Sequence, residues 1–289
     1  MVPSPDRGVK AMDYNRLNAN AAIEVMNGVK GKSVLVVGCN RGKDCKYFID
    51  LGANEVFGLD VLDDIGSEFN HPRAHYYRAS AEDMPFENDK FDLVYCFATM
   101  EHIPRIELAF SEMARVTKVG GCVYCVAAPL WNSVQGHHMA NYFVGHPWIH
   151  LRKSKAEILE YCQQNNITDS DGKTMDGCVN YMLDCKNFNM TPSKVYLTVC
   201  EGLPNMLIIQ NSLRFDKPGL LTEKIWTELR PKGFSKKELL ARTHWYVGMK
   251  VRDQRLKTKL HMQVLKLRHF ISTLKRIISQ LYLAKHDVK

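Results

Sequence analysis

Uninterrupted apolar runs alternate with amphipathic segments along the first half of the chain. The run Val34–Val37 has no polar position, which is typical of a strand that helices cover on both faces. Residues 43–51 then show apolar positions at helical spacing, and a second short apolar run ends at Asp60. Strand, helix and strand in this order predict an α/β fold with a doubly wound, mostly parallel sheet.

The same two patterns continue toward the end of the chain. Strands are predicted at 91–97 and 122–128, with a helix over 106–117 and a turn at Lys118–Gly121 between them. The remaining predicted elements are a helix over 13–28, a helix that begins at a capping box of Ser154 and Glu157, a sixth strand at 195–200, a strand or lid at 206–213, and a short helix with a final strand over 235–251.

Two glycines follow the first strand and mark a tight turn before the helix. Gly38 and Gly42 bracket this turn, and glycine lets backbone N–H groups approach a ligand closely at a helix N-terminus. Asp60, at the tip of the second strand, is placed to bind two ribose hydroxyls. Asn40 and Lys43 stand where the dinucleotide motif G-x-G-x-x-G has glycine, which weakens a nicotinamide interpretation. These residues predict an adenosine-containing ligand.

Two stretches carry a resemblance to a known family. The turn within 33–42, followed by Asp60, resembles the first motif of class I S-adenosylmethionine-dependent methyltransferases. The stretch 78–103, with its A-E-D-M-P-F sequence and the apolar strand after it, resembles the ubiquinone/menaquinone-biosynthesis-like members. The resemblance implies a seven-stranded Rossmann-like methyltransferase fold, S-adenosyl-L-methionine as the cofactor, and an enzyme that transfers a methyl group.

The resemblance also implies a set of cofactor-binding residues. Ser80 stands where the family usually has an acidic residue that reads the adenine, and Ala81 supplies a backbone N–H there. Phe97 and Ala98 fall where the backbone meets the sulfonium end of the cofactor. The chain departs from the family pattern at Ser80 and at Val36, both often acidic. The predicted cofactor set is Gly38, Asn40, Gly42, Asp60, Ser80, Ala81, Glu82, Phe97 and Ala98.

Histidines are the candidates for catalysis. Glu101 and His102 occupy the family's frequent E-H pair, for which contact with the substrate and plain capping or packing are both open. Residues 130–150 lose all periodicity and contain four histidines among several aromatic residues, so we expect a substrate-facing insertion. His138 and His137 are the favoured general bases for a methyl acceptor, and His102 is the third candidate.

A metal site in this insertion is a weaker alternative. His146 and His150 would share one helix face, but Pro147 argues against that helix, and no cysteine or carboxylate completes a ligand set. Cys122 and Cys125 form a C-x-x-C, but on a strand they point to opposite faces. The sequence therefore predicts no metal.

Composition narrows the class of protein. Of the 289 residues, 45% are hydrophobic and 24% are charged, which excludes a disordered or fibrous chain. No apolar run approaches the length of a membrane span, and the first residues lack the apolar core of a secretory signal. The nine cysteines are odd in number, and several lie in apolar runs, as expected of reduced thiols. We therefore expect a cytoplasmic protein.

The C-terminal segment differs from the rest in charge. From residue 253 it carries nine Lys or Arg against two Asp, so residues 1–252 are nearly neutral. Apolar residues recur at alternating spacings of four and three from Leu260 to Leu281, which favours a parallel coiled coil and hence a homodimer. Peripheral membrane contact by a basic amphipathic helix, and packing on the chain's own domain, are the alternatives. We predict a methyltransferase domain over 1–252 and a basic amphipathic helix over 253–289.

The expected function is methyl transfer from S-adenosyl-L-methionine to a small molecule or to a saccharide- or lipid-linked acceptor. Two other classes stay open. The departures from the family motifs favour a catalytically silent cofactor-binding or scaffold protein, and the nucleotide-type fold allows an NAD(P)-dependent oxidoreductase. A nucleic-acid substrate is disfavoured because the basic charge lies in one terminal segment and no N-P-P-[YF] motif follows the strand at 91–97.

Overall fold

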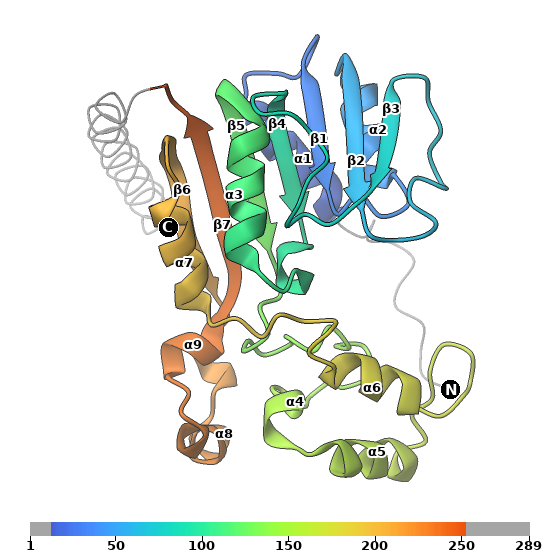
Figure 1. Ribbon diagram of the computed structural model, residues 1–289. Coiled ribbons are helices and arrows are strands. Elements are labelled where there is room, and N and C mark those ends of the chain that lie inside the picture. Colours follow the sequence, from blue (N-terminus) through green and yellow to red (C-terminus); the bar gives the residue numbers. More distant parts are fainter. Residues whose placement is uncertain (1–12, 253–289) are drawn as a thin grey trace, which may run out of the picture.

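A single seven-stranded sheet forms the centre of the molecule. The computed structural model describes residues 13–252, and its strands are ordered β3-β2-β1-β4-β5-β7-β6 (Figure 1). Strand β7 runs antiparallel to both of its neighbours, and the other paired strands are parallel. The predicted doubly wound, mostly parallel sheet is confirmed. The strands are β1 (Ser33–Val37), β2 (Glu55–Asp60), β3 (Ala74–Arg78), β4 (Phe91–Phe97), β5 (Thr117–Ala127), β6 (Met206–Phe215) and β7 (Ala241–Lys250).

Each face of the sheet packs against its own helices and has its own core. Helices α1 (Tyr14–Val25) and α2 (Lys43–Asp50) cover one face, and α3 (Ile106–Val116) and α7 (Ser193–Gly202) cover the other. Successive residues of β1 alternate between the two cores, so all four residues of Val34–Val37 are buried. This explains why the strand has no polar position.

Short helices form a cap beyond the carboxyl ends of the parallel strands (Figure 1). The chain between β5 and α7 contributes α4 (Ile149–Arg152), α5 (Lys155–Gln164) and α6 (Asp176–Leu183). The connection between β6 and β7 contributes α8 (Glu223–Leu229) and α9 (Lys236–Leu240). Two small apolar clusters hold the cap together, one within α4–α6 and one that joins Trp148 to α8 and α9. The structured insertion is therefore longer than the 130–150 stretch.

Three sequence predictions about strands are corrected by the structure. Residues 195–200, predicted as the sixth strand, lie in helix α7, where Tyr196 and Cys200 are buried one helical turn apart and Val195 is 40% exposed. Strand β3 was not predicted. None of the residues Ala74–Arg78 is fully buried, so the segment lacks the apolar run that marks the other parallel strands. Strand β5 begins at Thr117, so the predicted turn is part of a strand with an irregular register.

The helix predictions are confirmed in position and less well in orientation. Helix α5 begins at the predicted capping box, in which Ser154 and Glu157 exchange hydrogen bonds. In α3, Ile106 and Phe110 are buried, whereas Leu108 is 38% exposed. The tail predictions lie outside the described residues. Within residues 13–252, no helix is long and apolar enough to cross a bilayer.

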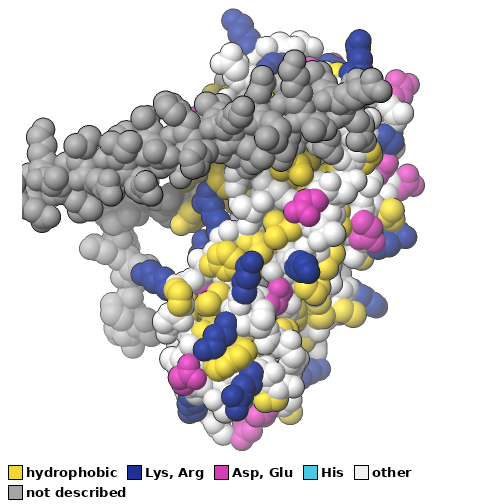
Figure 2. Space-filling view, turned by 90° about the vertical axis from the view of Figure 1, so that its left-hand side faces the viewer, with side chains coloured by type: hydrophobic (Ala, Val, Ile, Leu, Met, Phe, Trp, Pro, Cys, Tyr) yellow, Lys and Arg dark blue, Asp and Glu magenta, His cyan; other side chains and the backbone are white. Residues whose placement is uncertain are grey.

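The outer surface beside α7 is chemically mixed. Figure 2 shows apolar side chains on this face with both basic and acidic side chains among them. A shallow hollow of about 520 Å³ lies between α3 and α7, with Glu107 on one helix and Lys194 and Val195 on the other. Among the described side chains in this view, the basic groups do not form a continuous surface.

Candidate active site

A cavity of about 1000 Å³ opens at the carboxyl ends of β1, β2 and β4. Ligands of doubly wound sheets bind at this edge, where the strand order reverses beside the first strand. The volume is at the upper end of the range for small-molecule sites, so it can hold more than one ligand. One end is lined by the loops after β1 and β2, and the other by the turn after β4 and by α6 and the residues that follow it.

The glycine turn after β1 lines the first end of the cavity. Gly38 has φ +74°, and a Cβ atom on it would overlap the side chain of Thr99 in the turn after β4. Its N–H donates to the carbonyl of Leu59 (2.8 Å), which ties the turn to β2. Asn40 also has a left-handed backbone, at φ +51°. Only glycine at position 38 lets the two loops approach this closely.

Asp60 joins the loops after β1 and β2. One carboxylate oxygen accepts a hydrogen bond from the backbone N–H of Asn40 (2.8 Å), and the other accepts from those of Val61 (2.8 Å) and Leu62 (3.3 Å). The side chain is half-buried and lines the cavity. Asp60 therefore holds the glycine turn in place in addition to facing the ligand space.

The other predicted cofactor residues divide into two groups. Ser80, Ala81, Phe97 and Ala98 line the cavity. Gly42 and Glu82 are not among the lining residues. Gly42 begins helix α2 at φ +98°, packed against the hydroxyl of Tyr76, and the Glu82 carboxylate accepts three hydrogen bonds of 2.7 to 2.9 Å from Arg105. Both residues support loops that border the cavity.

Helix α1 adds a polar pair that the sequence did not reveal. The Asn15 side-chain amide donates to the Asp44 carboxylate (3.0 Å), and both residues line the cavity. Burial raises the pKa of Asp44, and the hydrogen bond from Asn15 opposes that rise. Tyr14, the residue before Asn15 in the same helix, is 64% exposed. A helical pattern alone did not show which face of α1 turns inward.

His102 lies at the second end of the cavity. It belongs to a 3-10 turn, Met100–His102, that is separate from the helix beginning at Ile106. Its Nδ1–H donates to the carbonyl of Asn187 (2.7 Å), which leaves Nε2 with its lone pair. Burial lowers the pKa of His102, and the bond to Asn187 opposes that shift. His102 is therefore a neutral imidazole at neutral pH.

Asn189 clamps the turn that carries His102. Its side-chain amide donates to the carbonyls of Met100 (2.8 Å) and Ile103 (2.9 Å), and its backbone N–H donates to the carbonyl of Glu101 (3.0 Å). No sequence signal indicated this residue, because it lies far along the chain in an irregular segment.

His138 and His137, adjacent in sequence, face different surroundings. His138 has φ +60° and donates from Nε2–H to the carbonyl of Pro129 (3.1 Å). Its ring lies near those of His102 and Phe188. His137 is buried, accepts from the N–H of Met139 (3.0 Å) and packs against His150 and Phe143 instead. Burial lowers the pKa of each to about 4, so both are neutral at pH 7.

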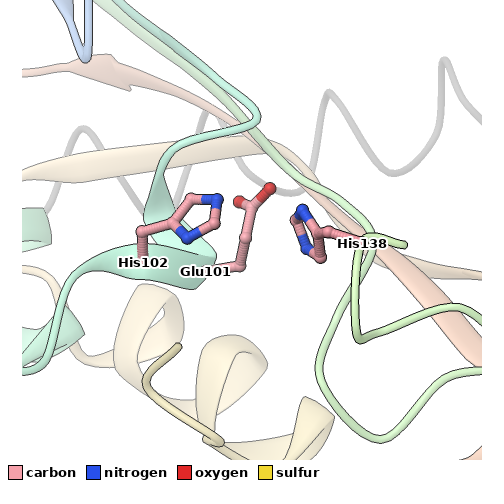
Figure 3. A group of neighbouring side chains, drawn as sticks. All are labelled: Glu101, His102 and His138. Atoms are coloured by element: carbon pink, nitrogen blue, oxygen red, sulfur yellow. The ribbon is translucent and has the colours of Figure 1, made fainter. Parts of the chain in front are cut away.

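Glu101 completes the group of titratable side chains at this end. It is fully buried, and burial raises its pKa to about 8, opposed in part by the backbone N–H groups of Glu101 and Ala128. Its carboxylate lies between the rings of His102 and His138 (Figure 3). One ligand-type atom from each of the three residues falls within 4.8 Å of the others. Neither His137 nor His150 belongs to this cluster, and α4 begins at Ile149, so His146 and His150 share no helix.

Comparison with known proteins finds a matching family model and several relatives. Residues 35–125 match the family model described as a methyltransferase domain. Over 121 residues the chain is 33% identical to a ubiquinone biosynthesis O-methyltransferase of Aliivibrio fischeri, covering 38% of this chain and 50% of that protein. Over 167 residues it is 23% identical to 24-methylenesterol C-methyltransferase 2 of Arabidopsis thaliana, covering 54% and 40%. The chain thus spans half or less of these curated relatives.

The geranyl diphosphate C-methyltransferase of Streptomyces coelicolor A3(2), solved with S-adenosyl-L-homocysteine, aligns with 81% of this chain and 77% of its own length at 13% identity and a TM-score of 0.49. The matched residues 35–125 include the loops after β1 and β2 at the first end of the cavity and the turn after β4 at the second. Residues 35–125 thus match a methyltransferase domain, which supports a class I S-adenosylmethionine-dependent methyltransferase with S-adenosyl-L-methionine as its cofactor.

Proposed function

We propose that this protein transfers the methyl group of S-adenosyl-L-methionine to a small-molecule acceptor or to a saccharide- or lipid-linked one. The observation that supports this most is the division of one cavity into two chemically different ends. The glycine turn and Asp60 form a nucleoside-type end, and His102 stands at the other. The relatives named for ubiquinone and sterol methylation support acceptors of this general class.

The residues of the first end suit the cofactor. Gly38 lines the cavity without a side chain, so the backbone of this turn can approach a ligand closely, as adenosine-binding turns require. Asp60 and Ser80 offer oxygens for the ribose and the adenine, and Asn15 and Asp44 offer polar atoms on the opposite wall. When bound, S-adenosyl-L-methionine supplies a methyl carbon activated by a sulfonium sulfur. The chain's own contribution is to hold the acceptor in line with that carbon.

The second end supports binding and deprotonation of an acceptor. Tyr181, Lys186 and Asn187 line it together with His102, and they offer aromatic, cationic and amide groups. Because Asn187 holds Nδ1–H, the Nε2 lone pair of His102 can accept a proton from an acceptor hydroxyl. Of the three proposed catalytic histidines, His102 alone lines the cavity; His138 acts beside it, and His137 has its Nδ1 lone pair engaged by Met139.

A labelled-methyl assay tests the proposed function. The protein is incubated with methyl-labelled S-adenosyl-L-methionine and fractionated pools of small metabolites, glycans and lipid-linked sugars. We expect label in one fraction with wild type, and at least a tenfold lower rate with His102→Gln at unchanged S-adenosylhomocysteine affinity, because one positioned proton acceptor contributes about 10²–10⁴-fold. The matched control is His146→Gln, since His146 packs on Tyr161 outside the cluster.

Two results would contradict the proposal. Label in no fraction, with tight S-adenosylhomocysteine binding, would favour a cofactor-binding protein without catalysis. Quenching of NADH fluorescence by the protein, with no affinity for S-adenosylhomocysteine, would favour an oxidoreductase instead.

A further inference from the structure

The cluster of Glu101, His102 and His138 brings together one carboxylate and two imidazoles from two separate segments. Glu101 and His102 lie in the 3-10 turn after β4, and His138 lies in the insertion after β5. Their ligand-type atoms lie within 4.8 Å of one another (Figure 3). No other group of three His, Cys, Asp or Glu with this spacing occurs within residues 13–252.

Backbone carbonyls fix both imidazoles in metal-binding tautomers. A carbonyl oxygen only accepts, so the contact with Asn187 requires a proton on Nδ1 of His102, and the contact with Pro129 requires a proton on Nε2 of His138. The remaining nitrogens, Nε2 of His102 and Nδ1 of His138, carry lone pairs. Metal-ligating histidines nearly always donate their other N–H to a carbonyl or carboxylate in this way.

The carboxylate between the rings lacks the partners that a buried acid requires. Neither buried oxygen of Glu101 makes a hydrogen bond of normal geometry among the described residues, although the backbone N–H groups of Glu101 and Ala128 lie near the carboxylate, and the residue is 2% exposed. An isolated buried carboxylate is costly, and buried charges are usually paired or coordinate metals. A cation at this point would satisfy both oxygens.

The backbone supports the same arrangement at a cost. His138 adopts φ +60°, a left-handed conformation that is uncommon for non-glycine residues. Asn189 holds the opposite side of the cluster through three hydrogen bonds to the turn of Glu101 and His102. Both sides of the cluster are therefore fixed by contacts that do not depend on an ion.

We propose that Glu101, His102 and His138 bind one divalent first-row transition metal ion, with Zn²⁺ as the preferred ion. Two histidines and one glutamate are a ligand set of catalytic zinc sites, in which a fourth position stays open to water or substrate. Bonds of about 2.0–2.1 Å place tetrahedral ligand atoms roughly 3.4 Å apart. The widest pair here, at up to 4.8 Å, closes to that spacing when each side chain moves by less than about 1 Å.

The open position would face the acceptor end, because His102 lines the cavity. An acceptor hydroxyl bound there would lose its proton to water more readily, since a bound Zn²⁺ lowers the pKa of an oxygen ligand. In the loaded protein, His102 is then a ligand and not the base. The proposal that the cluster binds an ion does not depend on the proposed function. The role of the ion toward the acceptor does rest on the proposed function.

Metal titration of the full chain tests the site without any acceptor. Protein dialysed against a chelator is titrated with Zn²⁺ and, separately, with Co²⁺ and Mg²⁺. We expect wild type to bind one more equivalent of Zn²⁺ than His138→Gln. In Glu101→Gln the Zn²⁺ affinity should fall about 100-fold or more. Mg²⁺ should bind weakly, because imidazole ligands disfavour Mg²⁺. His146→Gln, in the same insertion, is the control and keeps the wild-type stoichiometry.

Two further readouts separate this site from adventitious binding at exposed thiols such as Cys185. Co²⁺ should give visible bands of nitrogen and oxygen ligation that disappear in His138→Gln, with no thiolate charge-transfer band. Zn²⁺ should raise the melting temperature of wild type and not that of His138→Gln, because an ion that binds only the folded chain stabilises it. Equal Zn²⁺ stoichiometry and affinity in wild type, Glu101→Gln and His138→Gln, with folding verified by S-adenosylhomocysteine binding, would overturn the proposal.

Discussion

The two ends of the cavity are built by different means. At the first end, the backbone of a glycine turn and one half-buried carboxylate, Asp60, come from loops that follow adjacent strands. At the second end, buried titratable side chains come from the turn after β4 and from the insertion, and Asn187 and Asn189 hold them. The first end is a feature of the sheet, whereas the second depends on how the cap packs onto it. Variants of the two ends should therefore have separable effects.

The largest expected effect is at the glycine turn. Gly38→Ala places a methyl group against Thr99 in a left-handed backbone, so strain of about 1–2 kcal/mol and overpacking of about 1–3 kcal/mol add. We expect a loss of about 2–5 kcal/mol in unfolding free energy, measured in urea, and loss of S-adenosylhomocysteine binding. Gly120→Ala is the control, because Gly120 has φ +82° with open space around it and suffers strain alone. Equal destabilisation of the two variants would contradict the close approach.

Asp60→Ala should weaken the first end while the fold is kept. Hydrogen bonds to a charged group contribute about 1.5–3 kcal/mol, so S-adenosylhomocysteine affinity should fall about 10- to 150-fold by calorimetry. Asp63→Ala is the matched control, since the Asp63 side chain is 85% exposed and pairs only with Arg78. An unchanged affinity in Asp60→Ala would remove this carboxylate from the site.

Asn189→Ala should affect only the second end. The change leaves the carbonyls of Met100 and Ile103 without their donor, at a cost of about 1–3 kcal/mol, and releases the turn that carries His102. We expect slower methyl transfer with unchanged S-adenosylhomocysteine affinity. In the control, Asn165→Ala, an exposed side-chain amide outside the cavity loses its bond to the carbonyl of Tyr161. A parallel loss of cofactor affinity in Asn189→Ala would show that the two ends are coupled.

The smallest expected effect is a change in how the unfolding free energy depends on pH. It tests whether a lowered histidine pKa is specific to the second end of the cavity. Burial lowers the pKa of His150, beside the cap, and of His244, in the sheet, to about 3. The unfolded chain binds a proton near pH 6.5 that the folded chain excludes, so stability falls as the pH drops from 6.5 toward 3. Between pH 7 and 5.5 each histidine contributes about 1 kcal/mol to that fall. The variants His150→Gln and His244→Gln should each reduce this loss of unfolding free energy between pH 7 and 5.5 by the same amount, as measured by urea titration at both pH values.

An unequal reduction would reveal that the two regions differ in solvation. Equal reductions would show that a lowered histidine pKa reports burial in either region and does not identify a catalytic group. The geometry around Glu101 and His138, and not their titration, is then what distinguishes the second end.

Most of the first end could be predicted from the sequence. Gly38, Asp60 and the strand at 91–97 lie in about the first third of the chain. There the hydrophobic pattern and the turn residues predict the same order of strands and helices. The helix over 193–202 was mistaken for a strand because its β-branched residues hid the helical spacing of Tyr196 and Cys200. The orientation of helix α1 was not predicted either, since only the structure shows that Asn15, and not Tyr14, faces the cavity.

The second end could be predicted only in part. His102 and His138 were recognised as candidates, but their convergence on Glu101 depends on the path of the insertion after Pro129, where no periodicity exists. Asn187 and Asn189 reach the turn after β4 from more than 80 residues away. Contacts between irregular segments leave no pattern in the sequence, so the supporting residues were found only in the structure.

A crystal structure of the protein with S-adenosylhomocysteine tests the central claim most directly. The account predicts that the ribose lies against Asp60 and the backbone of the Gly38 turn, with the sulfur directed toward Ala98 and His102. An empty cavity at saturating ligand, or density for the ligand elsewhere on the molecule, would contradict it.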